Sequence, residues 1–217
     1  ELTIVQLSDI HIGTVNEWDY MERIAKKTNE LNPDIVMITG DLYDGSRKID
    51  DRIITPLNSI KAETFFVTGN HDLFEGIDEV MSILNRTKVK TLKNEVVEYE
   101  GIQIVGVENP TIEMTRSNDE IKNIKLDRNK PSVLMYHQPS GLEEANKAGI
   151  NLQLSGHTHH GQIMPFTLIS RTVYPRNNGL YNYEGTYMYV TEGTGTWGPF
   201  MRVGTRNEIT VVKLVKK

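Results

Sequence analysis

The chain has no cysteine, and this absence limits both its covalent chemistry and its metal chemistry. Disulfides, thiolate metal sites and a cysteine nucleophile are excluded. Any bound metal must therefore be held by nitrogen and oxygen ligands. The cellular compartment stays open, because disulfide-free proteins occur on both sides of a membrane.

Positive charge is also in short supply. The sequence has 24 Lys and Arg against 29 Asp and Glu, which gives a formal net charge of -5. Broad attraction to duplex nucleic acid normally requires a basic face, so duplex nucleic acid is disfavoured as a partner. A local basic groove remains compatible with this composition.

Long apolar runs are missing as well. No stretch approaches the ~20 apolar residues that span a bilayer, and no signal peptide is visible, so the chain as given is expected to be soluble. Glu1 is not an initiator methionine, and a strand is expected immediately after it. We therefore expect a missing N-terminal segment: an expression boundary, a cleaved export signal or a membrane anchor.

The pattern of apolar residues predicts one domain over residues 1–217 in which strands and helices alternate. A βαβαβα order is followed by a hairpin at 96–107 and a second βαβ unit, and 111–130 is expected to be a loop with one short helix. This order predicts an α/β (α+β) fold of two mixed sheets packed face to face, with helices outside. Helices are predicted at 17–31, 49–61, 75–85 and 142–148, and strands at 2–5, 34–39, 64–68, 132–136, 151–154, 185–191 and 209–215.

Five short polar signatures stand directly after apolar, β-branched runs, and five of the six histidines lie inside them. Because the carboxyl ends of parallel strands meet at one rim, these side chains are expected to gather there. Together they indicate a two-metal phosphoester hydrolase. The signatures are Asp9-x-His11, Gly40-Asp41-Leu42-Tyr43-Asp44, Gly69-Asn70-His71-Asp72, His137 and Gly156-His157-Thr158-His159.

Spacing favours shared ligands in the first and last signatures. Asp9 and His11 are expected to alternate along an extended segment, so that both side chains point the same way. His157 and His159 repeat this spacing and could reach a metal pair from the opposite side, and His137 completes the set.

The two central signatures supply the remaining chemistry. Asp41 follows a glycine that permits a tight turn, and its two carboxylate oxygens can bridge two metals. Asn70 offers a neutral carbonyl oxygen, while His71 is free to act on a substrate. Asp72 is expected either to orient the His71 imidazole or to cap the turn, and Asp44 to cap the loop or support the site.

In this order the signatures resemble the calcineurin-like metallophosphoesterase superfamily from Asp9 to His159. The resemblance implies a four-layer αββα sandwich and a catalytic role for His71. It also implies one metal held by Asp9, His11, Asp41 and His159, and another held by Asp41, Asn70, His137 and His157. Gly45 departs from the arginine that many members place after the second acidic residue.

Three further segments, 155–162, 193–202 and 208–210, resemble the YkuE/YaeI-type bacterial branch of this superfamily. That branch is often membrane-anchored or exported and includes enzymes that act on phosphodiester or pyrophosphate bonds, some in lipid precursors. The resemblance thus implies a phosphoester substrate that is a small molecule or lipid-linked.

The expected reaction uses a hydroxide that bridges two divalent metal ions, with no covalent enzyme intermediate. His71 would donate a hydrogen bond or a proton to a substrate oxygen. Manganese is expected by resemblance, and Fe, Zn or Ni would suit the same donors.

Several readings of the function stay open at this stage. The leading hypothesis is hydrolysis of phosphodiester or pyrophosphate bonds, and a phosphomonoesterase with the same centre is the nearest alternative. A nuclease is disfavoured by the net charge, and a catalytically silent scaffold is disfavoured by the intact signatures. The sequence does not indicate an oligomeric state.

Overall fold

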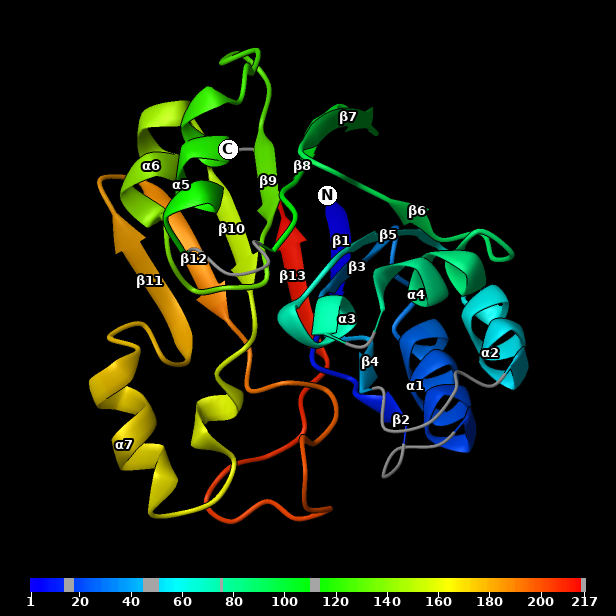
Figure 1. The fold of residues 1–217 in the computed structure, drawn as a ribbon. Coiled ribbons are helices and arrows are strands. Elements are labelled where there is room, and N and C mark those ends of the chain that lie inside the picture. Colours follow the sequence, from blue (N-terminus) through cyan, green and yellow to red (C-terminus); the bar gives the residue numbers. More distant parts are fainter. Residues whose placement is uncertain (14–17, 45–50, 75, 110–113, 216–217) are drawn as a thin grey trace.

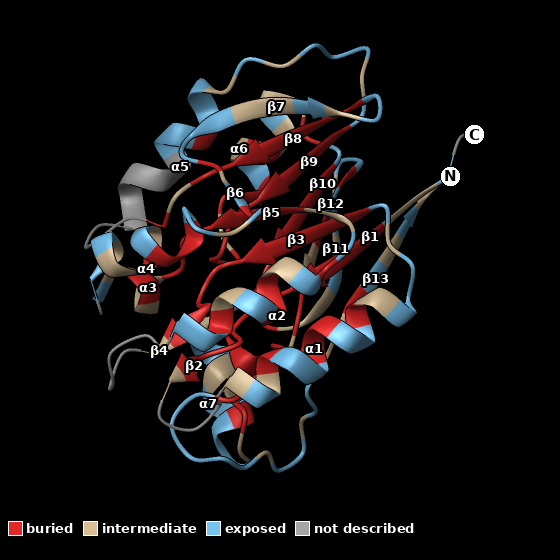
Figure 2. Ribbon diagram, turned by 90° about the vertical axis from the view of Figure 1, so that its right-hand side faces the viewer, coloured by how far each residue is buried: buried red, intermediate tan, exposed pale blue. Residues whose placement is uncertain are grey.

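Two β-sheets stacked face to face form the centre of the molecule (Figures 1 and 2). They are seen in a computed structural model of the 217-residue chain, which describes residues 1–13, 18–44, 51–74, 76–109 and 114–215. Both sheets are mixed, because parallel strands pair with an antiparallel strand at one edge of the first sheet and at both edges of the second.

The first sheet has the strand order β13-β1-β3-β5-β6. Its four N-terminal strands run parallel, and β13 pairs with β1 in the antiparallel sense. The strands are β1 (Leu2–Leu7), β3 (Ile35–Thr39), β5 (Glu63–Val67), β6 (Lys90–Thr91) and β13 (Thr210–Leu214). Its outer face is covered by α1 (Trp18–Glu30), the 3-10 turn η1 (Asp51–Ile53), α2 (Ile54–Ser59) and α4 (Ile77–Leu84).

The second sheet has the order β11-β12-β10-β9-β8-β7. Strands β8, β9, β10 and β12 are parallel, and the two edge strands are antiparallel to their neighbours. The strands are β7 (Glu95–Tyr99), β8 (Ile102–Gly106), β9 (Ser132–Met135), β10 (Leu152–Ser155), β11 (Gly179–Tyr183) and β12 (Thr186–Val190). Helices α5 (Met114–Asn123) and α6 (Leu142–Ala148) lie on its outer side (Figure 1).

The strands alternate their side chains between two apolar layers. In β3, Ile35 and Met37 point into the core between the sheets, whereas Val36 and Ile38 pack under the helices of the first sheet. In β9, Val133 joins the same inner core, and Leu134 faces the outer helices. A strand that is buried on both faces has apolar residues at successive positions, which explains the continuous apolar sequences of β3 and β9. The predicted four-layer αββα sandwich is confirmed.

Several elements differ from the sequence expectation. The predicted helix at 49–61 is split into η1 and α2, and residues 49–50 lie outside the described part. Segment 111–130 contains the ten-residue helix α5, whose Ile121 is fully buried against the second sheet, so this segment is more than a loop with a short helix. Helix α7 (Phe166–Val173) and strand β11 were not predicted. No described helix is both long enough and apolar enough to span a membrane.

Candidate metal centre

The five signatures converge at one rim of the two sheets. Strands β1, β3, β5, β9 and β10 all lead into this rim, each followed by one signature. Short elements follow there: β2 (Ile12–Gly13), β4 (Tyr43–Asp44), α3 (Asn70–Phe74) and the 3-10 turn η2 (His159–Gly161). The structure therefore brings together all of the predicted ligands: Asp9, His11, Asp41, Asn70, His137, His157 and His159.

One group of donor atoms combines the first signature, Asp9 and His11, with His159 of the last. The Nε2 atoms of His11 and His159 lie 3.0 Å apart, and Oδ1 of Asp9 lies 3.4 Å from His159 Nε2. All three side chains are buried. Burial, followed by the charge of the neighbouring His159, lowers the pKa of His11 to about 4. Burial and then the Arg202 guanidinium lower the pKa of His159 to about 3, so both rings are neutral near pH 7.

A second group forms around His137. Its Nε2 lies 3.2 Å from Asp41 Oδ2, 3.2 Å from Asn70 Oδ1 and 3.2 Å from His157 Nδ1. The same Oδ2 of Asp41 lies 3.8 Å from His11 Nε2, so this carboxylate stands between the two groups. This is the position that a bridging ligand would occupy.

Fixed partners aim several of these ring nitrogens into the cluster. His137 Nδ1 lies 2.8 Å from the Thr39 carbonyl oxygen, and His157 Nε2 lies 2.8 Å from the Tyr174 hydroxyl. The opposite nitrogen of each ring is thereby left facing the other donors. Outer partners of this kind are typical of histidines that ligate metals. The residues present therefore fit two divalent cations held by nitrogen and oxygen atoms.

Asp41 and His137 shift each other's pKa in opposite directions. Burial lowers the pKa of His137, but the charge of Asp41 and its hydrogen bond outweigh burial and raise the pKa to about 9. Burial also raises the pKa of Asp41, and His137 and His11 reverse this, so the pKa of Asp41 ends well below its usual range. A buried ion pair thus occupies the centre of the metal-free cluster.

The backbone around the ligands is turned, not extended. The φ angle is 52° at Asp9 and 51° at His11, and it is 72° at His157 and 48° at His159. The predicted alternation along extended segments was therefore wrong, because β1 ends at Leu7 and β10 ends at Ser155 before these residues are reached. Left-handed backbone at non-glycine residues is uncommon and concentrates at functional sites.

Two glycines let the carboxylates approach the backbone. A Cβ on Gly69 would lie 2.0 Å from Asp41 Oδ1, and a Cβ on Gly156 would lie 2.2 Å from Asp9 Oδ2. The amide of His157 donates to both oxygens of Asp9, at 3.0 and 3.1 Å. Close contact of this kind holds the ligand oxygens in place.

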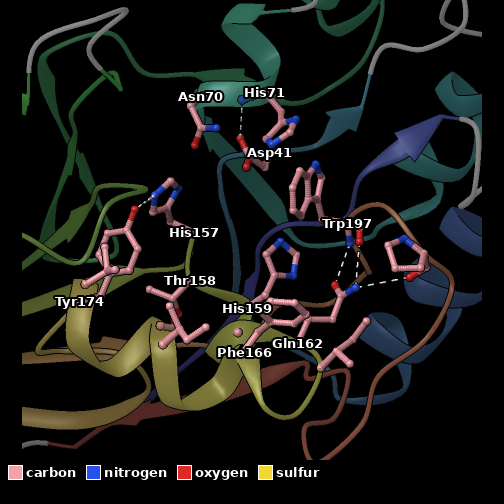
Figure 3. A pocket seen from close by; sticks show the side chains of 16 residues that line it. Asp41, Asn70, His71, His157, Thr158, His159, Gln162, Phe166, Tyr174 and Trp197 are labelled. Atoms are coloured by element: carbon pink, nitrogen blue, oxygen red, sulfur yellow. Dashed lines mark hydrogen bonds between the residues drawn. The ribbon is translucent and has the colours of Figure 1, made fainter.

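His71 stands beside the donor atoms and opens onto a cavity. Its Nδ1 lies 3.5 Å from Asp44 Oδ1, and its amide donates to Asp41 Oδ1 at 2.9 Å (Figure 3). Burial lowers the pKa of His71, but the hydrogen bond to Asp44 and the charge of Asp41 outweigh burial and raise it. Asp44 therefore favours the protonated imidazole.

Asp72 is fully buried and serves the backbone. Its carboxylate accepts hydrogen bonds from the amides of Asp41 at 2.8 Å, Tyr43 at 3.1 Å and Gly69 at 2.8 Å. Burial and the nearby charge of Asp41 raise the pKa of Asp72 to about 7. Of the two roles expected for Asp72, the geometry shows the turn cap, and the carboxylate paired with His71 is that of Asp44.

The sequence did not single out every residue that supports the centre. Tyr174, directly after α7, carried no motif, because its contact with His157 arises only in the folded chain. Arg202 was given no role of its own in the sequence analysis, yet its guanidinium lies 3.2 Å from His159 Nδ1 and donates to the carbonyls of Glu192 and Gly195. The only sequence feature that could have indicated this role of Arg202 is its position next to a glycine-rich loop.

A cavity of about 530 Å³ opens beside the centre (Figure 3). One wall carries Asp41, Asn70, His71, His157 and His159, and the other is largely apolar. No Lys or Arg is among the described residues that line it. The apolar wall is formed by Phe166, Ile169 and Val173 of α7 together with Trp197 and Pro199.

Comparisons with known proteins agree with this geometry. Residues 2–161 match the family model of the calcineurin-like phosphoesterases. An uncharacterized metallophosphoesterase of Helicobacter pylori J99 is 36% identical over 100% of this chain and 60% of its own length. An uncharacterized metallophosphoesterase of Aquifex aeolicus is 30% identical over 100% of this chain and 86% of its own.

A solved structure shares the fold. The crystal structure of a dimetal phosphatase from Danio rerio superposes with a TM-score of 0.58 at 11% identity and covers 88% of this chain and 87% of its own. The chain spans 60% of the Helicobacter relative, so it corresponds to one part of that longer protein. With the family match over most of its length and the two metallophosphoesterase relatives, the chain belongs to the calcineurin-like phosphoesterase family.

Proposed function

We propose that this chain hydrolyses phosphodiester or pyrophosphate bonds with the help of two divalent cations. The proposal is supported by the family match and by the buried cluster of His and Asp donor atoms at the strand ends. The YkuE/YaeI-type branch, a substrate that is a small molecule or lipid-linked, and the single-domain organisation remain predictions within this proposal.

The seven ligands would divide into two overlapping sets. Bound divalent cations neutralise phosphoryl oxygens and lower the pKa of water, so that hydroxide is available near neutral pH. Asp41 joins the two sets through its carboxylate. One cation would be held by Asp9, His11, Asp41 and His159, and the other by Asp41, Asn70, His137 and His157. Manganese is the expected metal, and Fe, Zn or Ni fit the same donors.

His71 is the proposed proton donor. It lines the cavity, lies beside Asp41 and has Asp44 behind its Nδ1, so its Nε2 is the ring nitrogen left for a substrate. A protonated imidazole in this position would donate to the leaving oxygen or to a non-bridging oxygen. Asp44 holds the ring in place and stabilises its charge.

The cavity wall is the observation that favours a diester or pyrophosphate over a monoester. A monoester dianion needs additional positive groups around its oxygens, whereas a diester needs room for a second substituent on phosphorus. The described lining supplies about 530 Å³ of space and neither Lys nor Arg. A phosphomonoesterase that uses the same centre is the second candidate.

The proposal is tested by comparing bis-p-nitrophenyl phosphate with p-nitrophenyl phosphate as substrates. Metal-stripped protein receives Mn, Zn, Ni or Mg in turn, and the initial rates are measured. We expect metal-dependent hydrolysis with the larger kcat/KM on the diester. A larger kcat/KM on the monoester would identify a phosphatase, and a rate independent of metal would contradict the proposal.

A further inference from the structure

Helix α7 has its apolar side chains on the outside. Its buried residue is Thr167, whereas Phe166, Leu168, Ile169 and Val173 are each more than half exposed. Surface helices normally bury their apolar stripe and expose their polar one. The reversed arrangement on α7 is stable in water only at a cost, which indicates that this surface has an apolar partner.

A second segment extends this surface. In residues 197–203, Phe200 is 68% exposed and Met201 50% exposed. The backbone joins the segment to the approach to α7, since the amide of Met164 donates to the Val203 carbonyl at 2.9 Å. Gln162 also donates to the Trp197 carbonyl at 2.8 Å. We call the exposed side chains of both segments the apolar rim: Phe166, Leu168, Ile169, Val173, Phe200 and Met201.

Half of the apolar rim lines the active-site cavity, and the rest lies on the same two segments. The cavity is lined by three of the rim residues, Phe166, Ile169 and Val173. It is also lined by Trp197 and Pro199 from the second segment. Figure 1 places α7 and the 193–207 segment at the end of the molecule away from the N-terminus. A protein docked over these residues would block access to the cavity. A lipid bilayer could contact the rim and still allow lipid molecules to enter the cavity from the bilayer.

The charge around the rim suits an anionic surface. Residues 161–183 contain Arg171 and Arg176 but no Asp or Glu, and residues 193–207 contain the exposed Arg206 but no Asp or Glu. Arg202 is not counted here, because its guanidinium points inward at His159 and loop carbonyls, and Glu192 between the two segments is paired with His160. This local excess of positive charge stands out in a chain of net charge -5. Aromatic and aliphatic side chains next to Arg are typical of segments that lie in the headgroup region of a bilayer.

We propose that the apolar rim docks this protein onto the surface of an anionic lipid bilayer, with the active-site cavity opening toward the lipid. The inference does not depend on the proposed function, because docking requires neither metal nor turnover. Insertion of the rim supplies the apolar contact, and the arginines add attraction that weakens as salt rises.

The test is flotation with vesicles of pure phosphatidylcholine or of phosphatidylcholine mixed with phosphatidylglycerol, on metal-free protein. We expect binding to the mixed vesicles that falls with salt and is weaker on the neutral ones. The double variant Leu168→Ser/Phe200→Ser should bind the mixed vesicles at least about tenfold more weakly than the wild type, since two apolar side chains no longer enter the lipid. Leu180→Ser, which removes a 64% exposed leucine from the edge strand β11, should bind like the wild type.

A second readout guards against a variant that merely misfolds. The chain has two tryptophans, and Trp197, which is 52% exposed and lines the cavity beside the rim, is the single reporter that remains in Trp18→Phe. Its emission should shift to shorter wavelength when mixed vesicles are added. Absence of vesicle binding, equal binding by the double variant, or an unchanged emission would overturn the proposal. A concentration-dependent dimer that the double variant abolishes, without vesicle binding, would instead assign the rim to a second copy of this chain.

Discussion

At the scale of residues, His137 and His157 each direct one ring nitrogen at the cluster and the other at a fixed partner. His157 presents Nδ1 to the other donors because Tyr174 holds its Nε2 at 2.8 Å. His137 does the reverse, with Thr39 at Nδ1. Orientation by such partners is part of metal affinity, since it fixes both the tautomer and the ring plane.

Tyr174→Phe should therefore weaken metal binding by about tenfold, because the ring of His157 loses the partner that orients it. The measurement is competition between the protein and a chelator for Mn²⁺. Tyr187→Phe serves as the matched control, as Tyr187 lies on β12 and is 45% exposed. Equal affinity in Tyr174→Phe and wild type would show that the hydroxyl contact does not orient the ligand.

His71→Ala should separate binding from turnover. We expect the variant to keep both metals and lose activity by about 10²–10⁴-fold, the usual contribution of a positioned acid. Asp41→Asn should lose metal and activity together, because the shared carboxylate is the residue common to both ligand sets. Metal content and kcat are measured on the same samples, and full activity in His71→Ala would contradict its assigned role.

At the scale of elements, the strand ends could be predicted and the turns after them could not. Parallel strands that are followed by Asp, Asn or His bring these side chains to one rim for any conformation of the loops between them. The set of candidate ligands from Asp9 to His159 could therefore be predicted from the sequence. The positive φ angles at those residues depend on contacts with distant chain, such as the hydrogen bond from Asp9 N to the Gly40 carbonyl. Nothing in the local sequence specifies such contacts.

Helix α7 was missed for a related reason. The helix has only eight residues and is rich in β-branched ones, such as Thr167, Ile169 and Val173, so its short apolar pattern does not distinguish a helix from a strand. The partners that it contributes to the centre, including the neighbouring Tyr174, were therefore invisible to pattern analysis. Its outward apolar face becomes explicable only when it is seen beside the cavity.

The turn between β10 and η2 offers a test at this scale. A Cβ on Gly156 would lie 2.1 Å from Ser8 Oγ, so Gly156→Ala must push apart the ends of β1 and β10. We expect a loss of about 1–3 kcal/mol in the free energy of unfolding and weaker metal binding. Chemical denaturation and chelator competition measure the two effects.

Gly101→Asn is the control for this variant, because a side chain at that turn meets no atom within 4 Å. Asn tolerates the left-handed backbone found there, so the change should be small. If Gly156→Ala were as stable as Gly101→Asn, the close packing of these two strand ends would not be required.

At the scale of the whole molecule, the metal-free cluster should set the pH dependence of stability. Burial first, and neighbouring positive groups second, lower the pKa of His11 and His157 to about 4 and that of His159 to about 3, from 6.5. Between these values and pH 6.5 the unfolded chain binds protons that the folded chain does not, so stability rises with pH. The pKa of Asp72 is raised to about 7, so this one carboxyl group makes stability fall with pH over the same range and partly offsets the three histidines.

Above pH 6.5 the sign reverses. The pKa of His137 is raised from 6.5 to about 9, so its stabilising contribution is complete below 6.5 and is lost as pH rises through about 9. We expect the Tm of the metal-free protein to pass through a maximum near pH 6.5, measured by thermal unfolding in chelator. His137→Gln should lose most of the alkaline decline, and His71, whose pKa is also raised, accounts for the part that remains. A wild-type Tm that keeps rising to pH 9 would contradict this assignment.

We propose that the seven side chains form one dinuclear centre that shares Asp41. Adding Mn²⁺ to metal-free protein and recording the stoichiometry together with the electron paramagnetic resonance spectrum tests this arrangement. Ions joined by one carboxylate lie roughly 3.5–4 Å apart and are magnetically coupled. We expect two Mn²⁺ per chain with the spectrum of a coupled pair. One Mn²⁺ per chain, or two that remain uncoupled, would rule out the shared centre.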